Sequence, residues 1–165
     1  MKKIIKEYNI YSYDELDENI KNELLEKEQE YQKEAYIESF LYNDMEDKAQ
    51  ELLKTYFKDK AELKNIYYDL SYCQGSGAMI EFDLYYYNKL VHIKQHGHYY
   101  HELSFIIDSY ELTEKQEEQL KEKIHTMNKE FSKYGFSLIE EEPDKDFCLE
   151  LLREKDYLKS GEVFY

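Results

Sequence analysis

The sequence predicts an α+β fold, in which a central antiparallel meander of three to five strands is flanked by long amphipathic helices. Apolar residues recur at helical spacing on both sides of the chain's middle, whereas residues in the middle alternate between apolar and polar. Gly and Pro number only 5 and 1, so nothing marks an interdomain linker. We therefore expect a single domain over 1–165, with an acidic helical part at about 13–57, the meander at about 64–108 and C-terminal helices at about 113–156.

The N-terminal third predicts a strand followed by helix. Lys2 to Tyr11 is rich in Ile and Tyr, which favours a strand. Ser12 followed by Glu15 is a capping box, so a helix should begin near Tyr13. Helical spacing then continues to Tyr56 without Gly or Pro, as one long helix or as two with a kink near residues 33–36.

The middle third predicts the meander. Ile80, Phe82 and Leu84 fall on one face of a strand, and Glu81 and Asp83 fall on the other. Asn88-Lys89 predicts a turn after this strand. The strands expected in this region are Asn65–Tyr72, Ala78–Tyr87, Leu90–Gln95 and His98–Ile107.

The last third predicts helices again. Thr113 and Gln116 form a second capping box, which opens an amphipathic helix that Gly135 is expected to end. A short strand is expected over Phe136–Ile139. Pro143 suits the first turn of a final helix, and the tail from Glu162 favours β structure.

Negative charge is concentrated near the N-terminus. The chain carries −15, and residues 7 to 51 hold fifteen acidic residues against four lysines, a net of −11. Proteins that grip phosphate backbones need clustered Lys and Arg, so direct nucleic-acid binding is disfavoured. The acids are either a solvated helix face or a surface for a basic partner. Under the second interpretation the partner-binding residues are Glu26, Glu30, Glu34 and Glu38.

The composition also suggests where the chain works. Tyr supplies 19 residues and Trp none, so much apolar area carries a hydroxyl and suits an exposed binding surface. We expect no membrane span and no signal peptide, because no apolar run is long enough. Cys73 and Cys148 lie far apart without CxxC spacing, which is typical of reduced cysteines in a cytoplasmic protein.

Four of the five histidines lie between His92 and His101. If His96-Gly97 is a two-residue hairpin turn, His92 faces His101 across the hairpin and His98 lies on the other face. His92, His98 and His101 are therefore candidate zinc ligands, with Glu81, Asp83 or Glu102 available to complete the site. The alternative is that the imidazoles and Tyr hydroxyls hydrogen-bond the strands without any metal or other cofactor.

The segment Ser71 to Ala78 holds two of the five glycines and Cys73. Its amides could cradle an anion, but no GK[ST] follows, so a tight bulged turn with Gly at positive φ is favoured. No activating charge accompanies Cys73 in sequence, and no catalytic residue is predicted. Gln74 is not needed for a turn and is expected to bind a partner.

The two unusual segments together resemble a family of small uncharacterised proteins of phages and mobile elements, which has a Ser-Gln-Gly-Asp-Gly loop and a Gly-His-Tyr-Tyr-His hairpin. The matching segments are Tyr11-Ser-Tyr-Asp-Glu-Leu-Asp17, Tyr72-Cys-Gln-Gly-Ser-Gly77 and Gly97-His-Tyr-Tyr-His101. This chain departs from the pattern at Cys73, Ser76 and Gln95, which stand for Ser, Asp and His. The resemblance carries over Gln74, Gly75, Gly77, His98, Tyr99, Tyr100 and His101, and it implies a phage context without an established activity.

Three functions follow as expectations. The first is a phage-type interaction protein of the anti-CRISPR or anti-defence kind, which binds a basic host protein as an acidic mimic of nucleic acid, with Gln74, Tyr99 and Tyr100 as further contacts. The second is a metal-dependent enzyme or metal-binding regulator built on the histidines. The third is an antitoxin.

Overall fold

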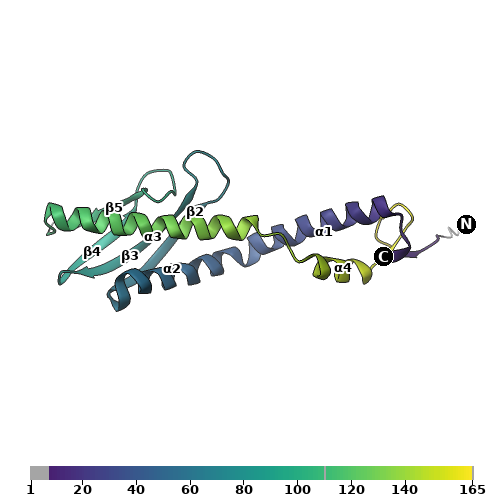
Figure 1. The fold of residues 1–165 in the computed structure, drawn as a ribbon, viewed down its shortest axis with the longest axis horizontal. Helices are drawn as coiled ribbons and strands as arrows, with labels where there is room; N and C mark the ends of the chain where they lie inside the picture. The colour runs from purple at the N-terminus through teal and green to yellow at the C-terminus, as the bar shows by residue number, and fades with distance from the viewer. Residues whose placement is uncertain (1–7, 110, 165) are drawn as a thin grey trace, which may run out of the picture. The chain divides into compact units, whose positions relative to one another are not determined.

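The computed structural model describes residues 8–109 and 111–164, and it has the predicted α+β class with antiparallel strands. Its internal contacts divide the chain, predicted as a single domain, into two compact units. Unit 1 comprises Met1–Glu38 and Glu142–Tyr165, and unit 2 comprises Ser39–Glu141. Within the described residues no helix is both long and apolar enough to cross a membrane. Each unit is described by itself, and Figure 1 labels the elements.

Unit 1 joins the two ends of the chain. Strand β1 (Tyr11–Ser12) pairs antiparallel with β6 (Asp156–Tyr157), and a bridge joins Tyr157 to Val163 in the predicted β-prone tail. Residues 2–7 of the strand predicted at Lys2–Tyr11 lie outside the described residues, and among residues 8–11 only Tyr11 belongs to a strand. The capping box of Ser12 and Glu15 exists, but it opens a 3-10 helix, Tyr13–Glu15, and the α-helix begins later.

The core of unit 1 is small and centred on tyrosine. Tyr13, Leu16, Leu152 and Tyr157 are buried together. The Tyr157 hydroxyl donates to the carbonyl of Leu152 at 2.9 Å, and burial raises the pKa of Tyr157 to about 12. Helix α4 (Lys145–Arg153) supplies Leu152 and is capped by Asp144. Pro143 therefore precedes this helix and does not lie in its first turn as predicted.

The long helical stretch is two helices. Helix α1 spans Glu18–Ser39 and α2 spans Leu41–Phe57. They separate at Phe40, whose φ of −122° departs from helical geometry, so the predicted kink lies several residues further along. Helix α2 buries an apolar stripe that begins at Leu41 and ends at Phe57.

Unit 2 contains the predicted meander as a four-stranded antiparallel sheet in the order β2-β3-β4-β5. The turn between the second and third of these strands is Tyr87-Asn88, both at positive φ, one residue before the predicted turn. Figure 1 shows α3 and α2 side by side across the sheet. The strands are β2 (Ala61–Asp69), β3 (Gly77–Tyr86), β4 (Lys89–Gln95) and β5 (Phe105–Asp108).

The last strand is shorter than predicted. Residues 98–104 belong to a loop, and the sheet pairs Gln95 with Phe105 and His92 with Asp108. The predicted hairpin turn at His96-Gly97, and with it the pairing of His92 and His101, is therefore wrong. The His96 amide donates to the carbonyl of Ser104 at 2.9 Å, so residues 96–104 form a longer connection between β4 and β5 than a two-residue turn.

Helix α3 (Glu114–Glu140) covers the inner face of the sheet. Thr113 caps it through the predicted capping box. Gly135 does not end the helix, and the strand predicted at Phe136–Ile139 is helical. Gly135 is buried against Leu70 and Met45, where a Cβ would lie 3.0 Å from each, so this glycine allows close packing and is not a cap.

Two polar side chains of α3 complete the hydrogen bonding of β3. Strand β4 pairs with β3 only from Phe82 to Tyr86, which leaves the first half of β3 without a strand on that side. There the Ser132 hydroxyl accepts from the Ala78 amide at 2.7 Å and donates to its carbonyl at 3.0 Å. Asn128 accepts from the Ile80 amide at 3.2 Å. Buried Asn128 and Ser132 thus satisfy backbone groups of β3 that a neighbouring strand would otherwise bond.

Candidate partner-binding surfaces

The four glutamates predicted to bind a partner all lie on α1 in unit 1. Glu26, Glu30, Glu34 and Glu38 are exposed and stand four residues apart in one uninterrupted helix. Four residues rise about 6 Å and turn slightly more than one full circle, so these carboxylates form a line along one side. The structure therefore brings the predicted residues onto a common surface.

Four further residues lie on or beside this surface, and sequence reasoning missed them. At 100° per residue, Glu23, Lys27 and Ile37 fall within the same arc as the four glutamates, and Tyr31 lies about 20° beyond its edge. All four are exposed. Tyr31 is 63% exposed and Ile37 is 40% exposed. A helical wheel drawn on α1 would have found them. We call this surface the acidic face of α1: Glu23, Glu26, Lys27, Glu30, Tyr31, Glu34, Ile37 and Glu38.

Ion pairing distinguishes the acidic face from the rest of α1. Among the described residues, no lysine or arginine forms an ion pair with any of its five glutamates. The opposite side of the same helix differs. Buried Glu28 accepts from Lys155 at 2.9 Å and from Gln32 at 2.8 Å. Burial alone would raise the pKa of Glu28, but the bonds from Gln32 and Lys155 outweigh it and lower the pKa.

The predicted glycine loop and the predicted histidine segment meet in unit 2. The Tyr100 amide donates to the Gly75 carbonyl at 3.3 Å. A Cβ on Gly75 would lie 2.1 Å from the Tyr99 ring, and a Cβ on Gly77 would lie 2.9 Å from the His101 Cα. Both glycines have the predicted positive φ, 92° and 150°, but residues 70–76 form a longer connection than the tight turn that was expected. We call residues 71–77 and 96–104 the paired loops.

Tyrosine rings fix the paired loops to the sheet and to each other. Tyr100 stacks on Tyr67 of β2 with ring centroids 5.8 Å apart, and Tyr99 stacks on His101 at 6.3 Å. Tyr99 remains 53% exposed although its ring covers Gly75. Gln74 is also exposed. The predicted contacts Gln74 and Tyr99 therefore lie on neighbouring loops with accessible side chains, whereas Tyr100 is partly buried.

The base of the glycine loop is a polar cluster. Ser71 donates to Asp69 through its amide and its hydroxyl, at 3.0 and 2.6 Å, and these bonds lower the pKa of Asp69. The Cys73 Sγ lies 3.7 Å from Asp69 and 3.2 Å from the Ser76 hydroxyl. The cluster holds the loop's shape, and the Ser76 hydroxyl accepts from the Cys73 amide at 2.9 Å.

The candidate zinc ligands do not converge as predicted. His92 lies on the outer face of the sheet, where its Nδ1 is 2.6 Å from Asp83, and Asp83 also pairs with Lys64 at 3.3 Å. Partial burial raises the pKa of Asp83, but bonds with His92 and Lys64 outweigh it and lower the pKa. His98 and His101 belong to the paired loops, and the His101 Nδ1 accepts from the Leu103 amide. Nowhere in the described ranges do three or more His, Cys, Asp or Glu side chains group to hold a metal.

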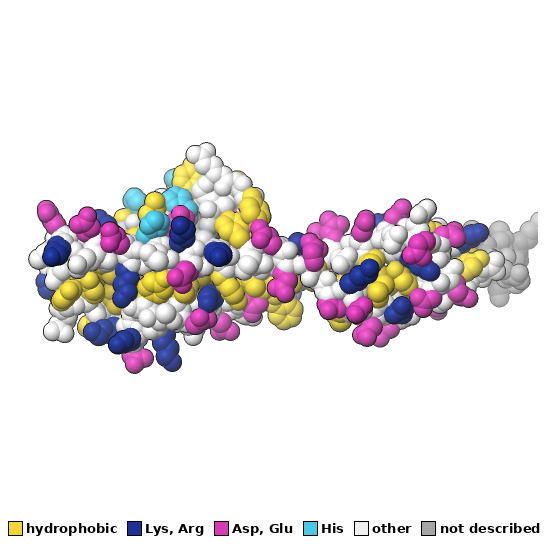
Figure 2. Space-filling view, in the orientation of Figure 1, with side chains coloured by type: hydrophobic (Ala, Val, Ile, Leu, Met, Phe, Trp, Pro, Cys, Tyr) yellow, Lys and Arg dark blue, Asp and Glu magenta, His cyan; other side chains and the backbone are white. Residues whose placement is uncertain are grey.

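Histidines nevertheless gather near the paired loops. Figure 2 shows histidine side chains along the edge of unit 2 that carries β5 and the loops. His125 of α3 lies 3.9 Å from Glu102 of the second loop. The contacts of these two loop-side imidazoles are thus a backbone amide for His101 and a carboxylate for His125.

Comparison of the chain with protein-family models, with curated proteins and with solved structures gives no match in any of the three.

Proposed function

We propose that this chain is an acidic protein-interaction module that binds a basic host protein through the acidic face of α1. The observation that carries the proposal is the row of exposed, unpaired carboxylates on one uninterrupted helix. The proposed partner is a protein whose own basic groove holds nucleic acid, because a line of carboxylates offers such a groove the charge of a phosphate backbone.

The spacing of these glutamates destabilises α1. Glu26, Glu30, Glu34 and Glu38 form three successive like-charge pairs at i,i+4, and each pair costs an isolated helix about 0.2–0.5 kcal/mol. Only one lysine of α1, Lys27, lies on this face. A solubilising surface would intersperse more of them, because lysines spaced three or four residues from glutamates stabilise a helix. A row of like charges is useful when it meets a row of opposite ones.

The two exposed apolar side chains give the acidic face more than charge. Tyr31 and Ile37 lie among the glutamates and would be buried by a partner. Long-range attraction raises the rate of encounter, and buried aromatic contacts then slow dissociation. The paired loops of unit 2, with Gln74 and Tyr99 exposed on a rigid base, are proposed as additional contacts that select the partner.

The biological setting follows from the resemblance to phage and mobile-element proteins. A small acidic protein of that origin would act by occupying a nucleic-acid-binding host factor, in the manner of an anti-CRISPR or other anti-defence inhibitor. An antitoxin would use the same surfaces against a basic toxin. The identity of the captured partner separates the two, because a toxin would be encoded beside this chain and a defence factor would belong to the host.

The experiment is capture from a host lysate with two matched variants. One changes Glu26, Glu30, Glu34 and Glu38 to Gln, and the other makes the same change at four exposed glutamates of unit 2, Glu114, Glu118, Glu122 and Glu141. We expect wild type and the second variant to retain one basic protein, which salt and double-stranded DNA release, and the first variant to lose it. Equal loss in both variants would show non-specific charge attraction and contradict the proposal.

A stability measurement shows whether lost capture reflects lost binding or an unfolded variant. Gln keeps the helix propensity of Glu and removes the like-charge pairs, so the first variant should melt at or above the wild-type temperature. Lost capture by a protein of unchanged or raised stability assigns the acidic face to binding.

A further inference from the structure

A cavity in unit 2 has the opposite electrostatic character to the rest of the chain. It has a volume of about 510 Å³ and lies where α2 ends and where β3 turns into β4. Of the described residues that line it, three are lysines and none is acidic, although the chain carries −15 overall. Figure 2 shows lysine side chains gathered at the end of this unit where α2 ends. The lysines are Lys58, Lys60 and Lys123.

These lysines are available to a ligand. Throughout the described ranges, none of the three forms an ion pair with a carboxylate, whereas Lys64 and Lys94 of the same unit do. Lys123 lies over the Phe57 ring, with its Nζ 4.7 Å from the centroid. Two acids close to this wall stand outside the cavity lining. Asp59 shares adjoining hollows with Lys58 and Lys60, and Glu130 accepts from the Tyr56 hydroxyl.

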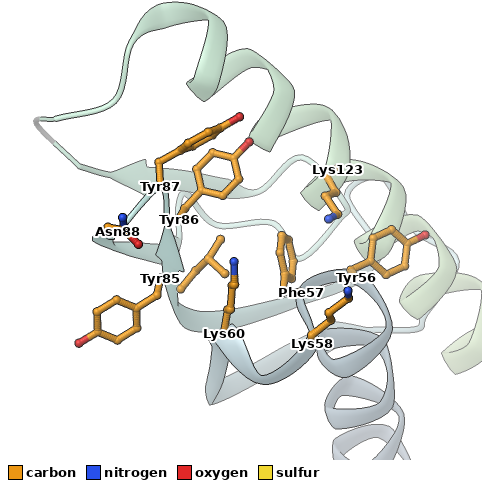
Figure 3. Close-up of a pocket in the computed structure, with 10 residues that line it drawn as sticks. Tyr56, Phe57, Lys58, Lys60, Tyr85, Tyr86, Tyr87, Asn88 and Lys123 are labelled. Atoms are coloured by element: carbon orange, nitrogen blue, oxygen red, sulfur yellow. The ribbon is translucent and has the colours of Figure 1, made fainter.

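Aromatic rings make up much of the remaining wall. Figure 3 shows Lys60, Phe57 and Tyr86 around the cavity, Tyr87 beside Tyr86, and Tyr85 turned away. The rings of Tyr86 and Tyr87 meet edge to face at 4.7 Å. Tyr87 is 59% exposed, so a planar group could stack on it without displacing a core contact.

The backbone at Lys58 supports selection of the lysine side chain. Its φ of 58° and ψ of −139° fall in a region that glycine adopts freely and that strains other residues. Glycine would relieve this strain while ending α2 equally well. The sequence keeps a lysine here, on the wall of the cavity.

We propose that this cavity binds a nucleotide, with the phosphate held by Lys58, Lys60 and Lys123 and the base stacked on the tyrosines. The volume falls within the range of about 300–1,000 Å³ typical of small-molecule sites. A compact anion that carries a planar ring can contact both the lysines and the tyrosine rings of the wall. A long nucleic-acid strand satisfies them less well, because its further phosphates would meet the acidic remainder of the surface.

The test uses calorimetry and amide NMR with four probes. The probes are adenosine monophosphate, adenosine, inorganic phosphate and a deoxyadenosine hexamer. We expect saturable binding of the monophosphate, at least about tenfold weaker binding of adenosine and of phosphate alone, and shifts centred on the amides of Leu84, Tyr86 and Lys123. No saturable binding of the monophosphate, equal binding of phosphate alone, or tighter binding of the hexamer would each overturn the proposal.

Variants locate the site. Lys60→Gln with Lys123→Gln should weaken monophosphate binding at least about tenfold, whereas Lys129→Gln, an exposed lysine of α3 outside the cavity, should leave it unchanged. Lys58→Gly should raise the melting temperature and yet weaken binding. Equal weakening by Lys129→Gln, or unchanged affinity in Lys58→Gly and in the double variant, would remove the nucleotide from this cavity. The acidic face of α1 has no part in these measurements, so their outcome is independent of partner capture.

Discussion

Unit 1 and unit 2 carry similar net charge on very different cores. Unit 1 has eighteen acidic and ten basic side chains, a net of −8 in 62 residues, and unit 2 has nineteen and twelve, a net of −7 in 103. Yet eighteen of the twenty-three buried apolar residues found in the described ranges belong to unit 2. A large apolar core therefore opposes the repulsion between like charges in unit 2, whereas only a small core opposes it in unit 1. This difference makes unit 1 the part whose stability depends on a few specific contacts.

The largest expected effect is the loss of Tyr157 from the core of unit 1. Tyr157→Ala should cost about 3–5 kcal/mol, because it empties the centre of the Tyr13, Leu16 and Leu152 cluster. Hydrogen exchange should show loss of protection in α4 and at the start of α1, with β3 and β4 still protected. Tyr157→Phe, which removes only the bond to the Leu152 carbonyl, should cost about 1 kcal/mol. Equal loss of protection in both units would break the comparison, since it would show one cooperative core.

The ion pair between Glu28 and Lys155 also tests whether the stability of unit 1 depends on a few specific contacts. Lys155→Met removes the cation that Glu28 contacts at 2.9 Å and should cost about 1–3 kcal/mol at pH 7. The pKa of Glu28 is lowered in the folded chain, so its stabilisation is present above the unfolded value of about 4.5 and is lost as pH falls through the lowered value. Urea unfolding should thus separate the two proteins at pH 7, and the difference between them should shrink as pH falls below 4.5. Lys159→Met, an exposed lysine of the same segment, should change little; an equal effect would point to net charge alone.

In unit 2 the paired loops should resist substitution for steric reasons. Gly75 and Gly97 both have positive φ, 92° and 85°, but only Gly75 has a neighbour within 4 Å of an added Cβ, the Tyr99 ring. Gly97→Ala should cost about 1–2 kcal/mol through backbone strain, and Gly75→Ala should cost more. Tyr99→Ala should recover the excess in a double-mutant cycle measured by urea unfolding. Identical costs at the two glycines would mean that the loops are not packed together.

The smallest stability effect is expected at Gln74. Gln74→Ala should change stability by no more than about 0.5 kcal/mol, because the side chain is exposed, while capture of the partner should fall. Ser76→Ala in the same loop should cost about 0.5–1.5 kcal/mol, since its hydroxyl bonds the Cys73 amide. Full capture by a stable Gln74→Ala protein would leave the loop a purely structural element.

Local patterns predicted the elements whose stability is decided locally. Alternation located β3 and β4 to within one residue, and the capping box at Thr113 located the start of α3, because each depends on neighbours in sequence. The hairpin after Gln95 failed for the opposite reason. Residues 96–104 are held by Gly75 and Tyr67, some twenty or thirty residues away in the chain, and no local pattern reports such a contact.

The same division explains the candidate sites. The four glutamates of α1 followed from periodicity alone and were found together on the helix. The cavity lined by Lys58, Lys60 and Lys123 was missed, since its residues come from three separate segments and each looks like an ordinary surface lysine in sequence. Gly135 predicted a helix end because glycine ends many helices, whereas here it makes room for Met45 and Leu70.

The side chains of α3 that bond to β3 have a consequence for self-association. An unpaired strand edge is a template on which another extended chain can add and from which aggregation can spread. In the first half of β3 that template is closed, because Ser132 bonds both the amide and the carbonyl of Ala78 and Asn128 bonds the amide of Ile80. An incoming strand would have to displace a helix to reach these groups. Two buried polar residues thus protect this tyrosine-rich sheet from adding copies of itself at that edge.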